Sequence, residues 1–139
     1  VASLRRWRGV AVRSFAGLAV AFCAWGLNVY IVDLADHWSA RDLTERYYAE
    51  RESAEVPLLA WQMNWKGENF YTGNRVFAFA ETDNKRIKKW LADNEGRRVF
   101  VLLEHKRLER FKKLLPGRTI ESLSTKRDNN KFLLVTLEI

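Results

Sequence analysis

At 139 residues the chain has room for one domain and a short additional segment, and its 47% hydrophobic residues are enough for a packed core. The net charge of +7 would suggest nucleic-acid binding, but four arginines ahead of Asp33 supply more than half of that excess. The remaining residues are nearly balanced in charge, which argues against nucleic acid as a partner. The single cysteine, Cys23, excludes a disulfide within the chain, and two histidines far apart in sequence give no metal-ligand set, so we expect no metal and no cofactor. Because the chain begins at Val1 rather than at methionine, we expect it to be a piece of a longer polypeptide.

A membrane-spanning helix is predicted near the N-terminus. From Ser14 to Val32 there are 19 residues without a charge, and they are apolar around the whole helix circumference. A bilayer core needs about 20 such residues. The alternatives are a cleaved signal peptide, whose apolar region is shorter, and a buried core helix. A surface helix of a soluble domain would show a polar face, which this run lacks. We expect residues 1–36 to form a basic flank and transmembrane helix, and residues 37–139 to form one domain.

The distribution of basic residues predicts the orientation of this helix. Positively charged residues favour the cytoplasmic side of a membrane. Four precede the apolar run and only two lie at a comparable distance after it, so we expect the domain on the periplasmic or extracytoplasmic side of the inner (cell) membrane. The residues concerned are Arg5, Arg6, Arg8 and Arg13 before the run, and Arg41 and Arg46 after it.

Helices and strands alternate in the first half of the domain. Ser39 is predicted to cap a helix that ends by Ser53. Leu58–Met63 is an apolar run that follows a proline and is predicted as a buried strand. Arg75–Ala80 is predicted as a second strand because of its β-branched and aromatic residues.

The alternation continues to residue 118. Thr82 or Asp83 caps a helix that Gly96 closes, and Val99–Leu103 is a continuous apolar strand of the kind covered on both faces. A further helix with an apolar face at Leu108 and Phe111 is stopped by a proline–glycine pair.

The chain ends in a predicted hairpin. Thr119–Ser124 is a weaker strand, Lys126–Asn130 is a polar turn and Phe132–Ile139 is the last strand. Strands that alternate with helices and then a terminal hairpin predict the fold class: one N-terminal transmembrane helix followed by a small, mainly parallel α/β sheet domain with a C-terminal antiparallel hairpin at one edge.

The segment Asn64–Asn74 has the most unusual composition in the chain. Its 11 residues hold three aromatic residues, two glycines, three asparagines and one pair of opposite charges. Aromatic faces beside amide and carboxylate groups suit sugar recognition. The alternative is a connection whose aromatic residues pack on the sheet and whose asparagines cap turns.

Two segments carry a family resemblance. Trp61–Asn74 and Thr125–Phe132 resemble the C-terminal end of bacterial membrane glycosyltransferases of family 39, relatives of protein O-mannosyltransferases and of lipid A aminoarabinose transferases. The resemblance implies a polytopic enzyme that transfers a sugar from a polyprenyl-phosphate carrier, so that the partners are the bilayer, this carrier and a missing N-terminal transmembrane part. Members use an acidic residue in an early extracytoplasmic loop that has no counterpart here. The resemblance therefore implies that this chain has no catalytic residue and no activity alone. It implies substrate-binding residues at Asn64, Trp65, Lys66, Glu68, Asn69, Tyr71, Asn74, Lys126, Arg127, Asp128 and Asn129.

The predicted topology places the two segments at one edge of the sheet. If the first four strands run parallel, their carboxyl ends share an edge, where ligands of open α/β sheets bind. Asn64 and Asp128 should then lie on the same side of the sheet. The connection Asn64–Asn74 is about the shortest that a parallel crossover allows, and as a hairpin it would move Asn64 to the opposite edge.

Other interpretations stay open. Glu104 and His105 could form an acid–base pair, or they could be a helix start with a solvated histidine. The basic residues of segment 85–118 could attract anionic headgroups or a pyrophosphate carrier, or they could be ordinary solvated surface. The alternative function is a single-pass, membrane-anchored binding or scaffold domain without enzymatic activity.

Overall fold

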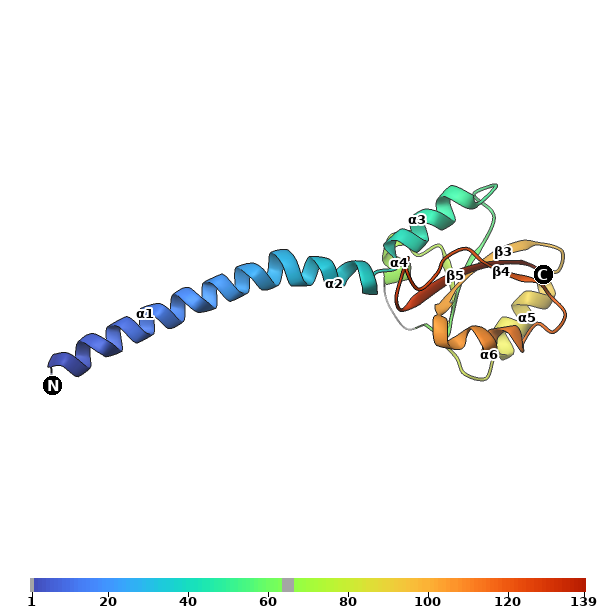
Figure 1. The fold of residues 1–139 in the computed structure, drawn as a ribbon. Coiled ribbons are helices and arrows are strands. Elements are labelled where there is room, and N and C mark those ends of the chain that lie inside the picture. Colours follow the sequence, from blue (N-terminus) through green and yellow to red (C-terminus); the bar gives the residue numbers. More distant parts are fainter. Residues whose placement is uncertain (1, 64–66) are drawn as a thin grey trace. The chain divides into compact units, whose positions relative to one another are not determined.

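In a computed structural model, the structure describes residues 2–63 and 67–139, with side chains for 7–35, 39–63 and 67–139. The chain divides into two compact units with the boundary after Asp36, and each is described here by itself. Figure 1 traces the chain from the N-terminal helix to the C-terminal strand. Three of the candidate residues, Asn64, Trp65 and Lys66, lie outside the described residues.

The first unit is helical from end to end. Helix α1 (Ala2–Trp25) passes into a π-helical turn (Gly26–Tyr30) and then into α2 (Ile31–Trp38). The apolar part, Trp7–Ala35, has 29 residues and is therefore about 43 Å long. Its side chains are exposed rather than buried within the chain, unlike those of a globular core helix. This helix is long and apolar enough to cross a membrane.

The π-helical turn holds the amide group of the apolar segment. Asn28 donates from Nδ2 to the carbonyl oxygen of Ala24 at 2.8 Å, so one N–H of the amide is paired inside its own helix. A polar group left unpaired in hydrocarbon would cost several kcal/mol. The hydrogen bond therefore lowers the cost of placing Asn28 in a lipid environment.

The second unit contains a five-stranded mixed sheet in the order β2-β1-β3-β5-β4. Strand β1 runs parallel to both β2 and β3, whereas β5 runs antiparallel to both β3 and β4. The prediction of a mainly parallel sheet is met only in part, because two of the four strand pairs are antiparallel. The strands are β1 (Leu58–Trp61), β2 (Val76–Phe79), β3 (Arg98–Glu104), β4 (Ile120–Ser122) and β5 (Phe132–Glu138).

Strand β5 lies inside the sheet, and it forms the predicted C-terminal antiparallel pair with β4, which is the outer strand of the two. It pairs with β3 over seven positions, from Arg98 opposite Glu138 to Glu104 opposite Phe132. Both strands are apolar and buried along almost their whole length, so each gains by having neighbours on both sides. Strand β4 has only three residues, none of them buried, and it takes the edge.

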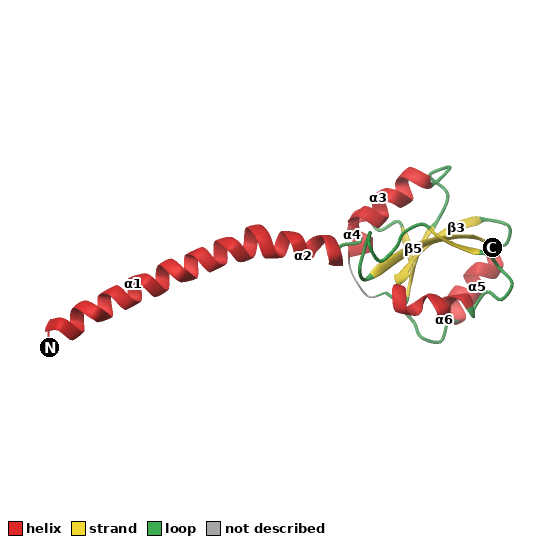
Figure 2. Cartoon of the chain, in the orientation of Figure 1, coloured by secondary structure: helices red, strands yellow, loops and turns green. Residues whose placement is uncertain are grey.

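Helices cover both faces of this sheet. Helix α3 (Arg41–Glu50) packs Leu43 and Tyr47 onto Phe100 on one face. Helices α5 (Lys85–Asp93) and α6 (Leu108–Lys112) cover the other face, where the buried side chains of the two helices join those of β1, β3 and β5. Figure 2 shows α3 on one side of the sheet and α5 and α6 on the other. The unit therefore has three layers with two apolar cores.

The connection between β1 and β2 contains a short helix, α4 (Gly67–Thr72), that the sequence did not predict. Because β1 and β2 are parallel, the hairpin alternative for this connection is wrong. The expectation that its aromatic residues pack on the sheet also fails for Phe70, whose side chain is 81% exposed. Asn74 has a positive φ of 63°, and its backbone N–H donates to the carbonyl oxygen of Asn69 at 2.8 Å as the chain turns into β2.

Candidate functional site

One edge of the sheet collects the carboxyl ends of four strands. Strands β1, β2 and β3 run in the same direction, and β4 shares it because both β3 and β4 are antiparallel to β5. The start of β5 lies at the same edge. We call the residues that follow these four strands and precede β5 the carboxyl rim: 62–63, 80–84, 105–107 and 123–131.

The ends of β1 and β2 are tied together by a side-chain amide. Trp61 donates from Nε1 and Gln62 donates from Nε2 to the same oxygen, Oδ1 of Asn84, at 3.0 and 3.3 Å. Gln62 and Asn84 both have left-handed backbones, with φ of 52° and 57°. Such conformations are uncommon for residues other than glycine, and the shared hydrogen bonds help to hold them.

Asn129 is the most heavily bonded side chain of the carboxyl rim, and it is only 1% exposed. Its Oδ1 accepts hydrogen bonds from the backbone N–H groups of Lys131 and Phe132 at 3.0 and 2.7 Å. Its Nδ2 donates to the backbone carbonyl of Ser39 at 2.7 Å. The backbone carbonyl oxygen of Asn129 lies 2.8 Å from Nε2 of His105. Asn129 therefore joins the β4–β5 connection to the end of β3 and to the start of α3.

Ser39 is where the two family-like segments meet. Its Oγ donates to the hydroxyl of Tyr71 at 3.1 Å, and its carbonyl oxygen accepts from Asn129. Tyr71 belongs to the first segment and Asn129 to the second, almost 60 residues further along the chain. As the sequence predicted, Oγ of Ser39 also accepts from the first turn of α3, at the backbone N–H of Arg41. The predicted proximity of Asn64 and Asp128 stays a prediction, because Asn64 lies outside the described residues.

Asp128 is used by its own turn. Its Oδ2 accepts from the backbone N–H of Thr125 at 2.6 Å and from the Thr125 hydroxyl at 2.9 Å. These two hydrogen bonds lower the pKa of the Asp128 carboxyl, chiefly through the backbone N–H. Lys126 and Arg127, between the two residues, are exposed to solvent. Within this turn the carboxylate is therefore hydrogen-bonded to Thr125, and the two cations are exposed to solvent.

Glu104 and His105 do not form an acid–base pair with each other. The carboxylate of Glu104 is buried and lies 2.9 Å from Nζ of Lys106 and 3.5 Å from Nε of Arg107, whereas the His105 ring contacts the carbonyl of Asn129. Burial raises the pKa of Glu104, but the hydrogen bond from Lys106 and the nearby positive charges outweigh it and hold the pKa below its usual value. Glu104 therefore pairs with the two basic residues that follow β3, and His105 connects the end of β3 to the β4–β5 connection.

The lowered pKa of Glu104 predicts a pH dependence of stability. A carboxyl whose pKa is lower in the folded state stabilises that state above its unfolded pKa, and the contribution is lost as the pH falls through the folded pKa. In Glu104→Gln the free energy of unfolding should change less between neutral pH and about pH 3 than in the unchanged chain. Urea denaturation at a series of pH values measures this. Equal slopes for both chains would contradict the prediction.

The remaining candidates of the first segment divide between the interior and the opposite edge. Glu68 is buried in α4, and Asn69 is half-buried. Asn74 precedes β2, so it lies at the edge opposite the carboxyl rim. The eleven candidates therefore do not form one surface: of those described, Lys126, Arg127 and Asp128 are exposed at the rim, and Tyr71 and Asn129 support it from within.

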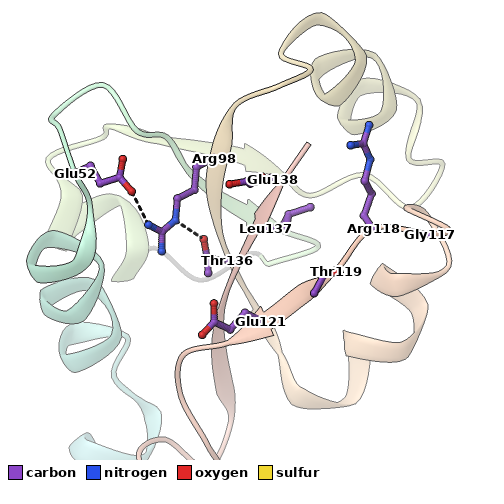
Figure 3. Close-up of a pocket in the computed structure, with 9 residues that line it drawn as sticks. All are labelled: Glu52, Arg98, Gly117, Arg118, Thr119, Glu121, Thr136, Leu137 and Glu138. Carbon is purple, nitrogen blue, oxygen red and sulfur yellow. Dashed lines mark hydrogen bonds and ion pairs between the residues drawn. The ribbon is translucent and has the colours of Figure 1, made fainter.

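A groove of about 410 Å³ lies at the opposite edge, where β3 begins and β5 ends. Figure 3 shows the guanidinium of Arg98 between Glu52 and Thr136, with Glu121 on the neighbouring strand. Nη1 of Arg98 lies 2.7 Å from Oε1 of Glu52, and its Nε donates to Oγ1 of Thr136 at 3.2 Å. No candidate residue lines this groove. Sequence reasoning missed it because an arginine followed by an apolar run reads only as the start of a strand.

Within the described part of the chain, no group of three or more His, Cys, Asp or Glu side chains is placed to hold a metal ion. Comparisons with protein-family models, curated proteins and solved structures find no significant match for this chain.

Proposed function

We propose that this chain is the C-terminal part of a membrane glycosyltransferase resembling family 39, which takes its sugar from a polyprenyl-phosphate carrier. In this proposal the apolar helix anchors the domain, and the carboxyl rim helps to shape the carrier or acceptor site. The catalytic acid would be supplied by the N-terminal transmembrane part of the same protein. Lys126, Arg127 and Asp128 would face the ligand, while Tyr71 and Asn129 would position them.

One observation supports this proposal most strongly: both family-like segments contact Ser39. Ser39 follows the apolar helix by four residues, counted from Ala35. The contacts from Tyr71 and Asn129 therefore join both segments to Ser39 within the domain. A short connection between an apolar helix and such a domain suits a protein that works on a lipid-linked substrate.

Sugar transfer tests the proposal. The polypeptide that contains this chain together with its N-terminal transmembrane part should transfer sugar in proteoliposomes supplied with polyprenyl-phosphate-linked sugars. The chain of residues 1–139 alone should give no transfer, because it lacks the early acidic loop. Turnover by the chain alone would contradict the proposal. Inactivity of the longer polypeptide with every such donor would favour an anchored binding or scaffold domain.

The orientation of the domain is a separate prediction. Because the N-terminal flank is basic, the domain should lie outside the cytoplasm. A reporter that is active only in the cytoplasm should be silent when fused after Ile139, and one that is active only outside should give signal. A strong signal from the cytoplasmic reporter would reverse the assignment.

A further inference from the structure

Five basic residues belong to two neighbouring segments of the carboxyl rim. They come from the residues after β3 and from the connection that leads into β5, and the contact between His105 and Asn129 holds these two segments together. Two carboxylates lie in or beside these segments, Asp128 in the connection and Glu104 at the end of β3, and each is engaged within the domain as described above. The basic residues are Lys106, Arg107, Lys126, Arg127 and Lys131.

The covalent chain limits how far Ser39 can lie from the end of the apolar helix. Ser39 is the fourth residue after Ala35, and a chain of that length spans at most about 14 Å. Asn129, which follows the exposed cations Lys126 and Arg127 in the same turn, is hydrogen-bonded to Ser39. If the helix spans a membrane, the turn is confined close to the lipid surface, and its local concentration there is high.

We propose that the Thr125–Lys131 turn docks on the anionic headgroups of the membrane that holds the helix. Long, flexible lysine and arginine side chains on an exposed turn suit the diffuse negative charge of a lipid surface, and each one near such a surface strengthens binding about fivefold. Asp128 keeps its negative charge, but the turn still carries three basic residues against this one carboxylate, a net charge of +2. The inference rests on the membrane-anchor part of the proposed function and does not require glycosyl transfer.

The test measures how close the turn lies to the lipid. The full chain, with Cys23→Ala to remove its own thiol, is placed in nanodiscs of phosphatidylcholine alone or with added phosphatidylglycerol. A fluorophore on Asn130→Cys reports quenching by headgroup spin-labelled lipid. We expect stronger quenching in the anionic discs, and we expect added salt to reverse it because screening weakens the attraction. The position control is Ala54→Cys, an exposed neutral residue before β1 and thus at the opposite edge.

Charge reversal supplies the second arm. Lys126→Glu with Arg127→Glu should lower the ratio of docked to undocked chains in anionic discs by at least about 25-fold. The matched control, Lys88→Glu with Lys89→Glu on the exposed side of α5, makes the same change in net charge and should leave the quenching unchanged. Equal quenching in neutral and anionic discs, or equal effects of the two charge reversals, would overturn the inference and leave the proposed function standing. A chain that does not stay with the nanodiscs would overturn the inference and the membrane anchor together.

Discussion

Replacing Asn129 with alanine should lower the free energy of unfolding of the domain by about 2–4 kcal/mol. The substitution removes the acceptor for the N–H groups of Lys131 and Phe132 and the donor to the Ser39 carbonyl. A buried polar group that loses its partner costs about 1–3 kcal/mol, and Asn129 is almost completely buried. Chemical denaturation of the full chain in detergent, followed by near-ultraviolet circular dichroism, measures the loss.

The neighbouring residue provides a matched control. Asn130 is exposed, and its side chain makes none of the hydrogen bonds found among the described residues. Asn130→Ala should change the free energy of unfolding by less than about 0.5 kcal/mol. If the two substitutions lower the free energy of unfolding equally, Asn129 does not hold the β4–β5 connection. The contacts of the two segments with Ser39 then contribute nothing measurable to stability.

Phe111→Ala should have an effect of similar or greater size, about 3–5 kcal/mol. Phe111 is completely buried, and its ring packs against that of Trp61 with 5.1 Å between centroids. The substitution would leave a cavity between α6 and β1, because the sheet and helices cannot collapse fully around it. The same denaturation experiment measures this loss.

Two further substitutions separate cavity formation from the general loss of an aromatic ring. Phe111→Leu keeps most of the volume and should cost less than about 1.5 kcal/mol. Phe70→Ala removes an exposed ring from α4 and should cost less than about 0.5 kcal/mol. A Phe111→Ala chain as stable as Phe70→Ala would mean that the core on this face of the sheet is wrongly described.

The sequence predicted the elements whose pattern is long or strongly apolar. Val99–Leu103 has no polar residue, and this favours a strand buried on both faces, which is what β3 is. The position of β5 could not be predicted in the same way. Its apolar run fits equally well at an edge or in the interior, and the choice depends on pairing with β3, some 30 residues earlier in the chain. The sequence therefore predicted the antiparallel pair of β4 and β5 but not which of the two lies at the edge.

The candidate site was predictable only in part, because backbone groups form much of it. The Ser39 side chain was predicted to accept from the first turn of α3, but the contact of Ser39 with Asn129 uses a backbone carbonyl oxygen, which every residue carries. Helix α4 has six residues, too few for an apolar period to show. Asn74 was included because it belongs to the segment Asn64–Asn74. Because β1 and β2 are parallel, it lies before β2 at the edge opposite the carboxyl rim.

The interior position of β5 also constrains the order in which the domain can assemble. Strands β1, β2 and β3 can pair as soon as the first three-quarters of the chain is available, but among the described strands β4 pairs only with β5. Until β5 arrives, β3 presents seven mostly apolar residues along an open edge, which is a template for pairing with other chains. A chain made or exported from its N-terminus would thus pass through a stage with this edge unprotected. Aggregation during synthesis should depend on how quickly residues 132–138 follow β3.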